Sequence, residues 1–272
     1  MSWFHEPLQA GFFVRGIVAA VLVMVGGAVL GFGVLTRRSA YLGQGVSQSM
    51  LAGVAAGATM GASPTLSAFA GALIAAVLIS SLSKVKGLGP EAAVAIVSSA
   101  ALSAGVVLIS ADRTRAVNLN NLLFGNVLGV TWTEIITLTF AVTGACFFSV
   151  WHGRRLALSA IAPSVAVAHG VNVRRLELAR VVTLAMITAA AVQVVGVTLV
   201  VAALVLPAGV GAALTRTLGG AHLVAVGTAV ITGVLGLYVS YWYDLASGPA
   251  VVLVGTLFYL LTLSVARVHS RQ

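Results

Sequence analysis

The chain is a succession of apolar stretches separated by short groups of charged, glycine or proline residues. A helix that crosses a bilayer needs about 20 mainly apolar residues, and fewer when it is buried among other helices. The pattern predicts membrane helices near residues 10–35, 47–62, 65–82, 90–109, 133–152, 178–195, 197–215, 221–242 and 249–267. We therefore expect an all-α, polytopic membrane protein of about nine spans, with residues 1–272 forming a single transmembrane domain.

Two segments leave the number of spans open at eight to nine. The stretches 178–195 and 197–215 meet at Gly196. If they form one bent helix, the count falls to eight and the C-terminus changes sides of the membrane. The segment 116–130 is also compatible with a partial helix that never crosses.

The composition supports a membrane location. Hydrophobic residues make up 60% of the chain and charged residues only 8%, and the mean hydropathy is +1.08. A soluble domain uses about 25% charged residues to keep its surface hydrated. The chain is therefore expected to reside in a bilayer.

The net charge of +9 is distributed in a way that predicts orientation. Lys and Arg beside apolar runs mark the cytoplasmic side of a membrane protein. Alternating spans place most of the basic residues on one side, which predicts an outside N-terminus and a cytoplasmic C-terminus. No basic face with interleaved aromatic residues is visible, so we expect no nucleic-acid partner. The basic residues in question are Arg37, Arg38, Lys84, Lys86, Arg154, Arg155, Arg174, Arg175, Arg180, Arg216, Arg267 and Arg271.

Sequence motifs for catalysis are missing. There is no G-x-x-x-x-G-K-[ST] run for nucleotide phosphates, no H-E-x-x-H pair and no C-x-x-C pair. The single Cys146 lies within an apolar stretch. We expect no catalytic residue and no metal site. The predicted span centres carry no Asp, Glu, Lys or Arg, whereas proton-driven carriers usually keep such a residue, so an energy source on a partner is favoured.

Glycines recur at a spacing of four in the predicted second span, at Gly53, Gly57 and Gly61. Small residues at this spacing let two helix backbones approach closely. The spacing predicts helix packing. It leaves open whether the contact is ordinary packing or a tight interface beside a transport pathway.

The order of several motifs resembles the integral-membrane permeases of ABC importers for manganese, zinc and iron, the metal-type ABC-3 family. The resemblance extends from about residue 10 to residue 268. The motifs that carry it are Arg-Arg-x-x-Tyr-Leu-Gly at 37–43, the acidic helix start at Glu91, Leu-Phe-Gly-Asn-Val-Leu-Gly at 123–129, Ala-His-Gly-Val-Asn-Val at 168–173, Val195–Ala208 and Val239–Pro249.

This resemblance implies an ABC importer permease fold and a specific assembly. The chain would be the transport subunit, itself not an enzyme, in a bacterial plasma membrane. It would pair with a second permease copy and bind two cytosolic ATP-binding subunits, which hold the ATP and Mg²⁺. An extracytoplasmic substrate-binding protein would deliver cargo, and ATP-driven alternating access would move it inward. No cofactor is expected in this chain.

The resemblance also implies a site of contact with the ATPase. The predicted cytosolic loop 154–177 matches the position of the family's coupling helix, here Ser164–Gly170. Its implied contact residues are Ser164, Val165, Ala166, His169 and Gly170. An ordinary amphipathic connector is the alternative.

The chain departs from the family at the expected metal site. Metal-type members carry an Asp and, four residues later, a His near the start of the second span, where this chain has Gln44 and Gln48. Neutral amides are weak ligands for manganese or zinc. With Ser47, the pair is expected to line the pathway for a weakly held cation or to hydrogen-bond a chelated or neutral cargo. Alternatively, they are only polar residues at the entry of the helix and have no part in transport. A secondary carrier, a channel and a membrane scaffold are the competing classes of protein.

Overall fold

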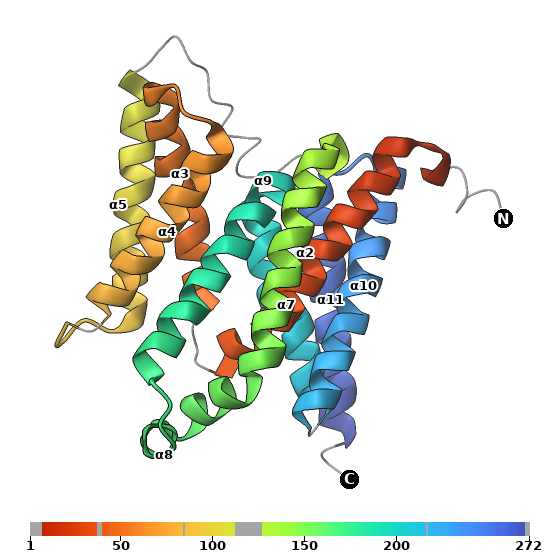
Figure 1. Cartoon of the computed structure of the whole chain (residues 1–272). Helices are drawn as coiled ribbons and strands as arrows, with labels where there is room; N and C mark the ends of the chain where they lie inside the picture. The colour runs from red at the N-terminus through yellow and green to blue at the C-terminus, as the bar shows by residue number, and fades with distance from the viewer. Residues whose placement is uncertain (1–6, 37–39, 84, 112–126, 216, 270–272) are drawn as a thin grey trace.

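The computed structural model describes residues 7–36, 40–83, 85–111, 127–215 and 217–269 (Figure 1). Segment 112–126, with part of the Leu-Phe-Gly motif, lies outside this range. So do the basic residues Arg37, Arg38, Lys84, Arg113, Arg115, Arg216 and Arg271. The helices are η1 (Pro7–Gln9), α2 (Gly11–Thr36), α3 (Ala40–Met60), α4 (Pro64–Leu82), α5 (Pro90–Ala111), η2 (Val127–Gly129), α7 (Trp132–Ile161), α8 (Pro163–Ala168), α9 (Val173–Leu214), α10 (Leu218–Tyr243) and α11 (Ser247–His269).

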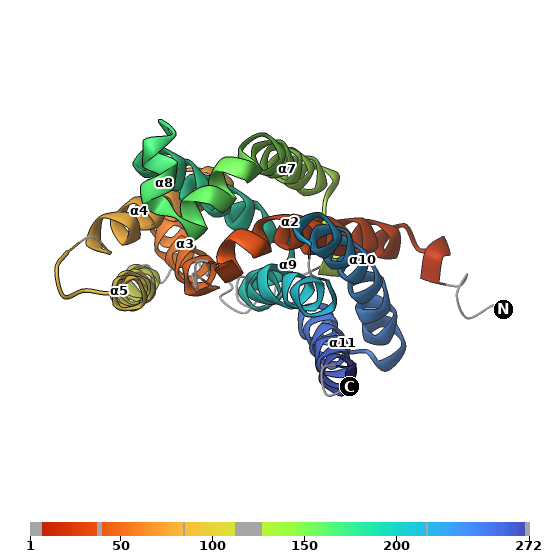
Figure 2. The ribbon, with the colours of Figure 1, turned by 90° about the horizontal axis from the view of Figure 1, so that it is seen from below.

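The long helices form one bundle around α9. Helices α3, α4 and α5 pack together on one side, and α2, α7, α10 and α11 lie on the other (Figures 1 and 2). Helix α9 contacts α2, α3, α4, α7, α10 and α11 and is the most buried of the candidate spans. It therefore joins the two sides of the bundle.

Helix α9 reverses direction at Gly196. This residue has φ 79° and ψ 170°, a conformation essentially restricted to glycine. Contacts with α2 show the reversal. Gly26 of α2 lies against Ile187 and Gly33 lies against Arg180, so α2 runs opposite to the first half of α9. Gly27 lies against Ala203 and Phe32 lies against Gly211, so α2 runs in the same direction as the second half. The segments 173–195 and 197–214 are therefore antiparallel, as Figure 1 shows.

This reversal resolves the number of passes. Seven helices of the described residues are long and apolar enough to cross a membrane. Helix α3, with 21 residues, and the second half of α9 bring the passes that the described residues make through the bundle to nine. The expectation of an all-α polytopic protein is confirmed for the described residues.

Local capping explains where several helices begin. Ser63 accepts a hydrogen bond from the amide of Leu66 at the start of α4, and Pro64 occupies the first helical position. Thr131 and Glu134 form a capping box at the start of α7. The Asn172 carboxamide oxygen accepts from the amide of Arg175 at 3.1 Å and so caps α9. These caps fix where α4, α7 and α9 begin.

Candidate functional site

The polar residues of α3 lie within the helix. Helix α3 begins at Ala40, earlier than the predicted start at residue 47. Gln44 is exposed and Gln48 is half-buried. Their separation of four residues places both on one side of the helix, and the partly exposed Ala52 and Ala56 continue the same row. We refer to Gln44, Gln48, Ala52 and Ala56 as the α3 stripe.

Ser47 does not belong to this stripe. Its side chain is fully buried, and its hydroxyl donates a hydrogen bond to the carbonyl oxygen of Gly43 at 2.6 Å. Ser49 donates to the carbonyl oxygen of Gly45 in the same way. The structure therefore brings Gln44 and Gln48 together and separates Ser47 from them.

Gly53 and Gly57 of α3 face α4. A Cβ on Gly53 would collide with the carbonyl oxygen of Ser67, and one on Gly57 would collide with the Ser67 side chain. Gly61 plays a different part: it follows the end of α3 with φ +70°, and a Cβ added to it would have open space around it. The amide of Ala62 then donates to the carbonyl oxygen of Gly57, which closes the helix end.

Most of segment 154–177 is helical rather than an open loop. Helix α7 continues to Ile161, the short α8 follows at one end of the bundle, and α9 begins at Val173 (Figure 1). Gly170 has φ +74°, and the amide of Val171 donates to the carbonyl oxygen of Ala166 at 3.0 Å. This pattern ends α8 at a left-handed glycine.

Helix α8 is held by a single buried side chain, that of Ala166. Ser164, Val165 and Val167 are exposed, and 61% of Val167 is accessible. His169 is also exposed, and its Nδ1 lies 2.9 Å from the carbonyl oxygen of Val165. The helix thus presents an apolar, uncharged surface at the end of the bundle.

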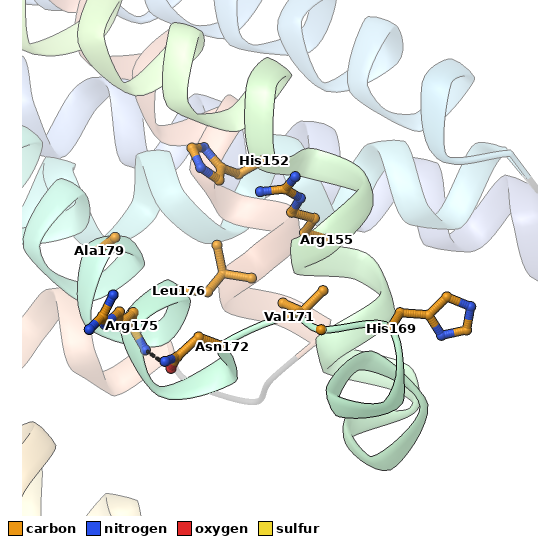
Figure 3. A pocket seen from close by; sticks show the side chains of 9 residues that line it. His152, Arg155, His169, Val171, Asn172, Arg175, Leu176 and Ala179 are labelled. Atoms are coloured by element: carbon orange, nitrogen blue, oxygen red, sulfur yellow. Dashed lines mark hydrogen bonds between the residues drawn. The ribbon is translucent and has the colours of Figure 1, made fainter.

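A cleft of about 450 Å³ lies beside α8, between the end of α7 and the start of α9. Figure 3 shows His152 and Arg155 of α7 on one side and Arg175 and Leu176 of α9 on the other, with the His169 ring directed away. This cleft could not be expected from the sequence, because its residues come from two helices that only the fold brings together.

Several buried polar groups were likewise not expected from the sequence. Arg180 is buried and bonds with the carboxylate of Glu177, with 2.6 Å between nitrogen and oxygen. The spacing of three residues was the available signal for this pair. Further along α9, Thr188 Oγ1 and Gln193 Nε2 are buried without a hydrogen-bond partner among the described residues.

In the part of the chain that the structure describes, no group of three or more His, Cys, Asp or Glu residues lies close enough to hold a metal ion. Gln44 and Gln48 offer amide oxygens as acceptors and amide N–H groups as donors. This chemistry suits hydrogen bonding more than tight binding of a bare divalent cation.

The comparisons with known proteins cover nearly the whole chain. The profile of the ABC 3 transport family matches residues 9–266. The manganese transport system membrane protein MntC of Listeria innocua is 31% identical over 96% of this chain and 93% of its own length. The high-affinity zinc uptake system membrane protein ZnuB of Haemophilus influenzae is 28% identical over 91% and 94%.

A solved structure shows the same fold. It is that of PsaBC from Streptococcus pneumoniae in complex with Fab, with a TM-score of 0.84 and 24% sequence identity. The match covers 96% of this chain and 94% of the compared one. The arrangement of nine passes is therefore a known fold.

Proposed function

The chain belongs to the ABC 3 transport family, and we propose that it is the permease subunit of an ATP-driven importer related to manganese, zinc and iron importers. The observation that carries this proposal is the family match over residues 9–266. Relatives named for manganese and zinc transport, similar along almost their full lengths, support it. In this role the chain has no catalytic residue, and ATP hydrolysis belongs to a cytosolic partner.

The α3 stripe is the proposed wall of the transport pathway. An exposed amide such as Gln44 in a membrane helix is unfavourable against lipid and is expected to face protein or water. A second copy of the chain would cover this stripe and enclose a pathway between the two copies. The small side chains of Ala52 and Ala56 would leave room for cargo along it.

The end of the bundle that carries α8 is the proposed cytoplasmic end. Arg154 and Arg155 lie near the end of α7, and Arg174 and Arg175 lie at the start of α9. The C-terminal end of α11 lies at the same end of the bundle, on another side of it (Figures 1 and 2). Excess Lys and Arg favours the cytoplasmic side. The N-terminus would then lie outside, where a substrate-binding protein delivers cargo in a bacterial plasma membrane.

Helix α8 is the proposed contact with the ATPase subunits. Its exposed Val165 and Val167 are unfavourable in water, so a protein groove is a suitable environment for them. The left-handed Gly170 would hold the approach to α9 in one shape. Closure of two ATPase subunits would push α8 and switch the pathway from outward to inward facing.

The amide pair makes a chelated or neutral cargo a second candidate beside a bare metal ion. Replacement of a carboxylate and an imidazole by amides removes a charge and a nitrogen ligand from the pathway. An amide can accept and donate hydrogen bonds to a polar organic chelate. The cargo would thus be held at this point by hydrogen bonds or as a weakly bound cation.

Reconstitution would test these proposals. The chain, its ATPase and its binding protein would be placed in liposomes, and ATP-dependent uptake of manganese, zinc and iron would be measured. Uptake by the unmodified protein would support a metal cargo. Metal uptake gained only in the Gln44→Asp/Gln48→His variant, with binding-protein-stimulated ATP hydrolysis in both proteins, would support a changed cargo.

The same measurements separate the importer from the competing classes of protein. Uptake without ATP would contradict the importer and favour a secondary carrier. Association with the partner proteins without any transport would favour a scaffold.

A further inference from the structure

The cleft between α7 and α9 has the chemistry of an anion site. Its lining contains the guanidinium-bearing Arg155 and Arg175, together with His152 and Asn172, and no acidic side chain. A phosphate oxygen can accept charge-assisted hydrogen bonds from two guanidinium groups. The cleft also lies at the start of α9, where the helix dipole favours negative charge.

His152 supplies a second feature that points to a ligand. Its Nδ1 is buried and has no hydrogen-bond partner among the described residues. The ring stacks on Phe148 with 4.8 Å between ring centroids, which restricts its orientation. In Figure 3 the side chains of His152 and Arg155 lie next to each other on the α7 side of the cleft. The His152 side chain also lines the cleft, so its imidazole lies beside the space that a phosphate would occupy.

The level of the cleft relative to the membrane indicates where the phosphate comes from. On α7, Phe147, Val150 and Trp151 are exposed apolar side chains, and the exposed Arg154 and Arg155 follow within one turn. Tryptophan and arginine in this order mark the boundary between hydrocarbon and headgroups. The cleft therefore lies at the level of lipid headgroups, and basic pockets between membrane helices on the cytoplasmic side bind anionic headgroups.

We propose that this cleft binds the phosphate of an anionic phospholipid headgroup. Arg155 and Arg175 would contact the phosphate oxygens from opposite sides, and His152 would contact it from the floor. A bound lipid would connect the end of α7 to the start of α9 immediately beside α8. The proposal rests on the proposed cytoplasmic orientation of this end of the bundle, and it does not depend on the cargo or on the ATPase.

The test measures binding of phosphatidylglycerol to the purified full-length chain in detergent by native mass spectrometry. The site variant is Arg155→Gln/Arg175→Gln, and the matched control is Arg154→Gln/Arg174→Gln. Both variants remove two exposed arginines from the same helix ends, but only the first pair lines the cleft. Because charge-assisted hydrogen bonds are lost, we expect about tenfold weaker binding in the site variant and little change in the control.

A conservative variant, a second lipid and two competing ligands complete the test. Arg155→Lys/Arg175→Lys should retain most of the binding, and the unmodified chain should prefer phosphatidylglycerol to phosphatidylcholine. Equal losses in the site and control variants, or equal binding of the two lipids, would overturn the proposal. Glycerol phosphate binding as tightly as the lipid would overturn a lipid source, and a polyglutamate peptide displacing the lipid at lower concentration would point instead to an acidic protein partner.

Discussion

Gly27 of α2 packs directly against the backbone of Ala203 in α9. A Cβ on Gly27 would lie 2.5 Å from the carbonyl carbon and oxygen of Ala203. Gly31, one turn later, meets the carbonyl oxygen of Leu204 in the same way. Two glycines four residues apart thus allow close backbone approach at the centre of the bundle.

Substitution at this contact should destabilise the bundle. Gly27→Ala would force α2 and α9 apart, and overpacking of this kind costs about 1–3 kcal/mol. Thermal unfolding of the detergent-solubilised chain should show a lower midpoint. Gly144→Ala in α7 is the matched control, because no atom lies within 4 Å of its added Cβ. Equal midpoints for the two variants would contradict the contact.

The reversal in α9 predicts a strict requirement for glycine at residue 196. Gly196→Ala would place a Cβ on a backbone with φ 79°, a conformation that costs of order 1–3 kcal/mol for other residues. We expect a lower unfolding midpoint and a smaller monodisperse fraction in size-exclusion chromatography. Gly227→Ala, at an uncrowded position of α10, should behave like the unmodified chain. If both variants are equally stable, the reversed geometry is wrong.

The proposed orientation can be read by cysteine labelling in a Cys146→Ala background. Ala62→Cys lies in the exposed turn between α3 and α4, and Ser164→Cys lies on exposed α8 at the other end of the bundle. A membrane-impermeant maleimide should label the first variant in intact cells and the second only after permeabilisation. The reverse pattern would place α8 outside and remove it from contact with a cytosolic ATPase.

Gly170 tests the role of α8 in coupling. Its left-handed conformation costs a β-branched residue roughly 1–2 kcal/mol, whereas asparagine adopts it more readily. Gly170→Val should therefore reduce cargo uptake and binding-protein-stimulated ATP hydrolysis together, by about tenfold. Gly170→Asn should retain most of both activities. A Gly170→Val variant with normal uptake would favour a carrier that needs no ATPase contact.

The membrane-embedded parts of the fold were predictable from hydropathy. The expected spans 65–82 and 221–242 differ from α4 and α10 by no more than three residues at either end. Hydropathy failed where helices continue into polar sequence. Helix α7 extends to Ile161 because arginine, leucine and alanine favour helix in water as well. Helix α3 begins at Ala40, before the apolar stretch used to predict it.

The candidate sites were less predictable because they depend on contacts between distant residues. The spacing of Gln44 and Gln48 predicted a shared side of α3, but it could not show that Ser47 turns inward to Gly43. The cleft combines His152 and Arg155 with Arg175, and no pattern along the chain links these positions. Burial of Arg180 likewise follows from packing near α2, which hydropathy does not contain.

A connection of one residue between two antiparallel membrane helices leaves no flexible loop that could take up their relative movement. Gly196 joins the halves of α9 without a loop, and α2 touches both of them. We therefore expect a tilt of residues 173–195 to be accompanied by a movement of residues 197–214. Only residues 169–172 connect α8 to the first half of α9. A displacement of α8 should therefore be transmitted through α9 to the opposite end of the molecule.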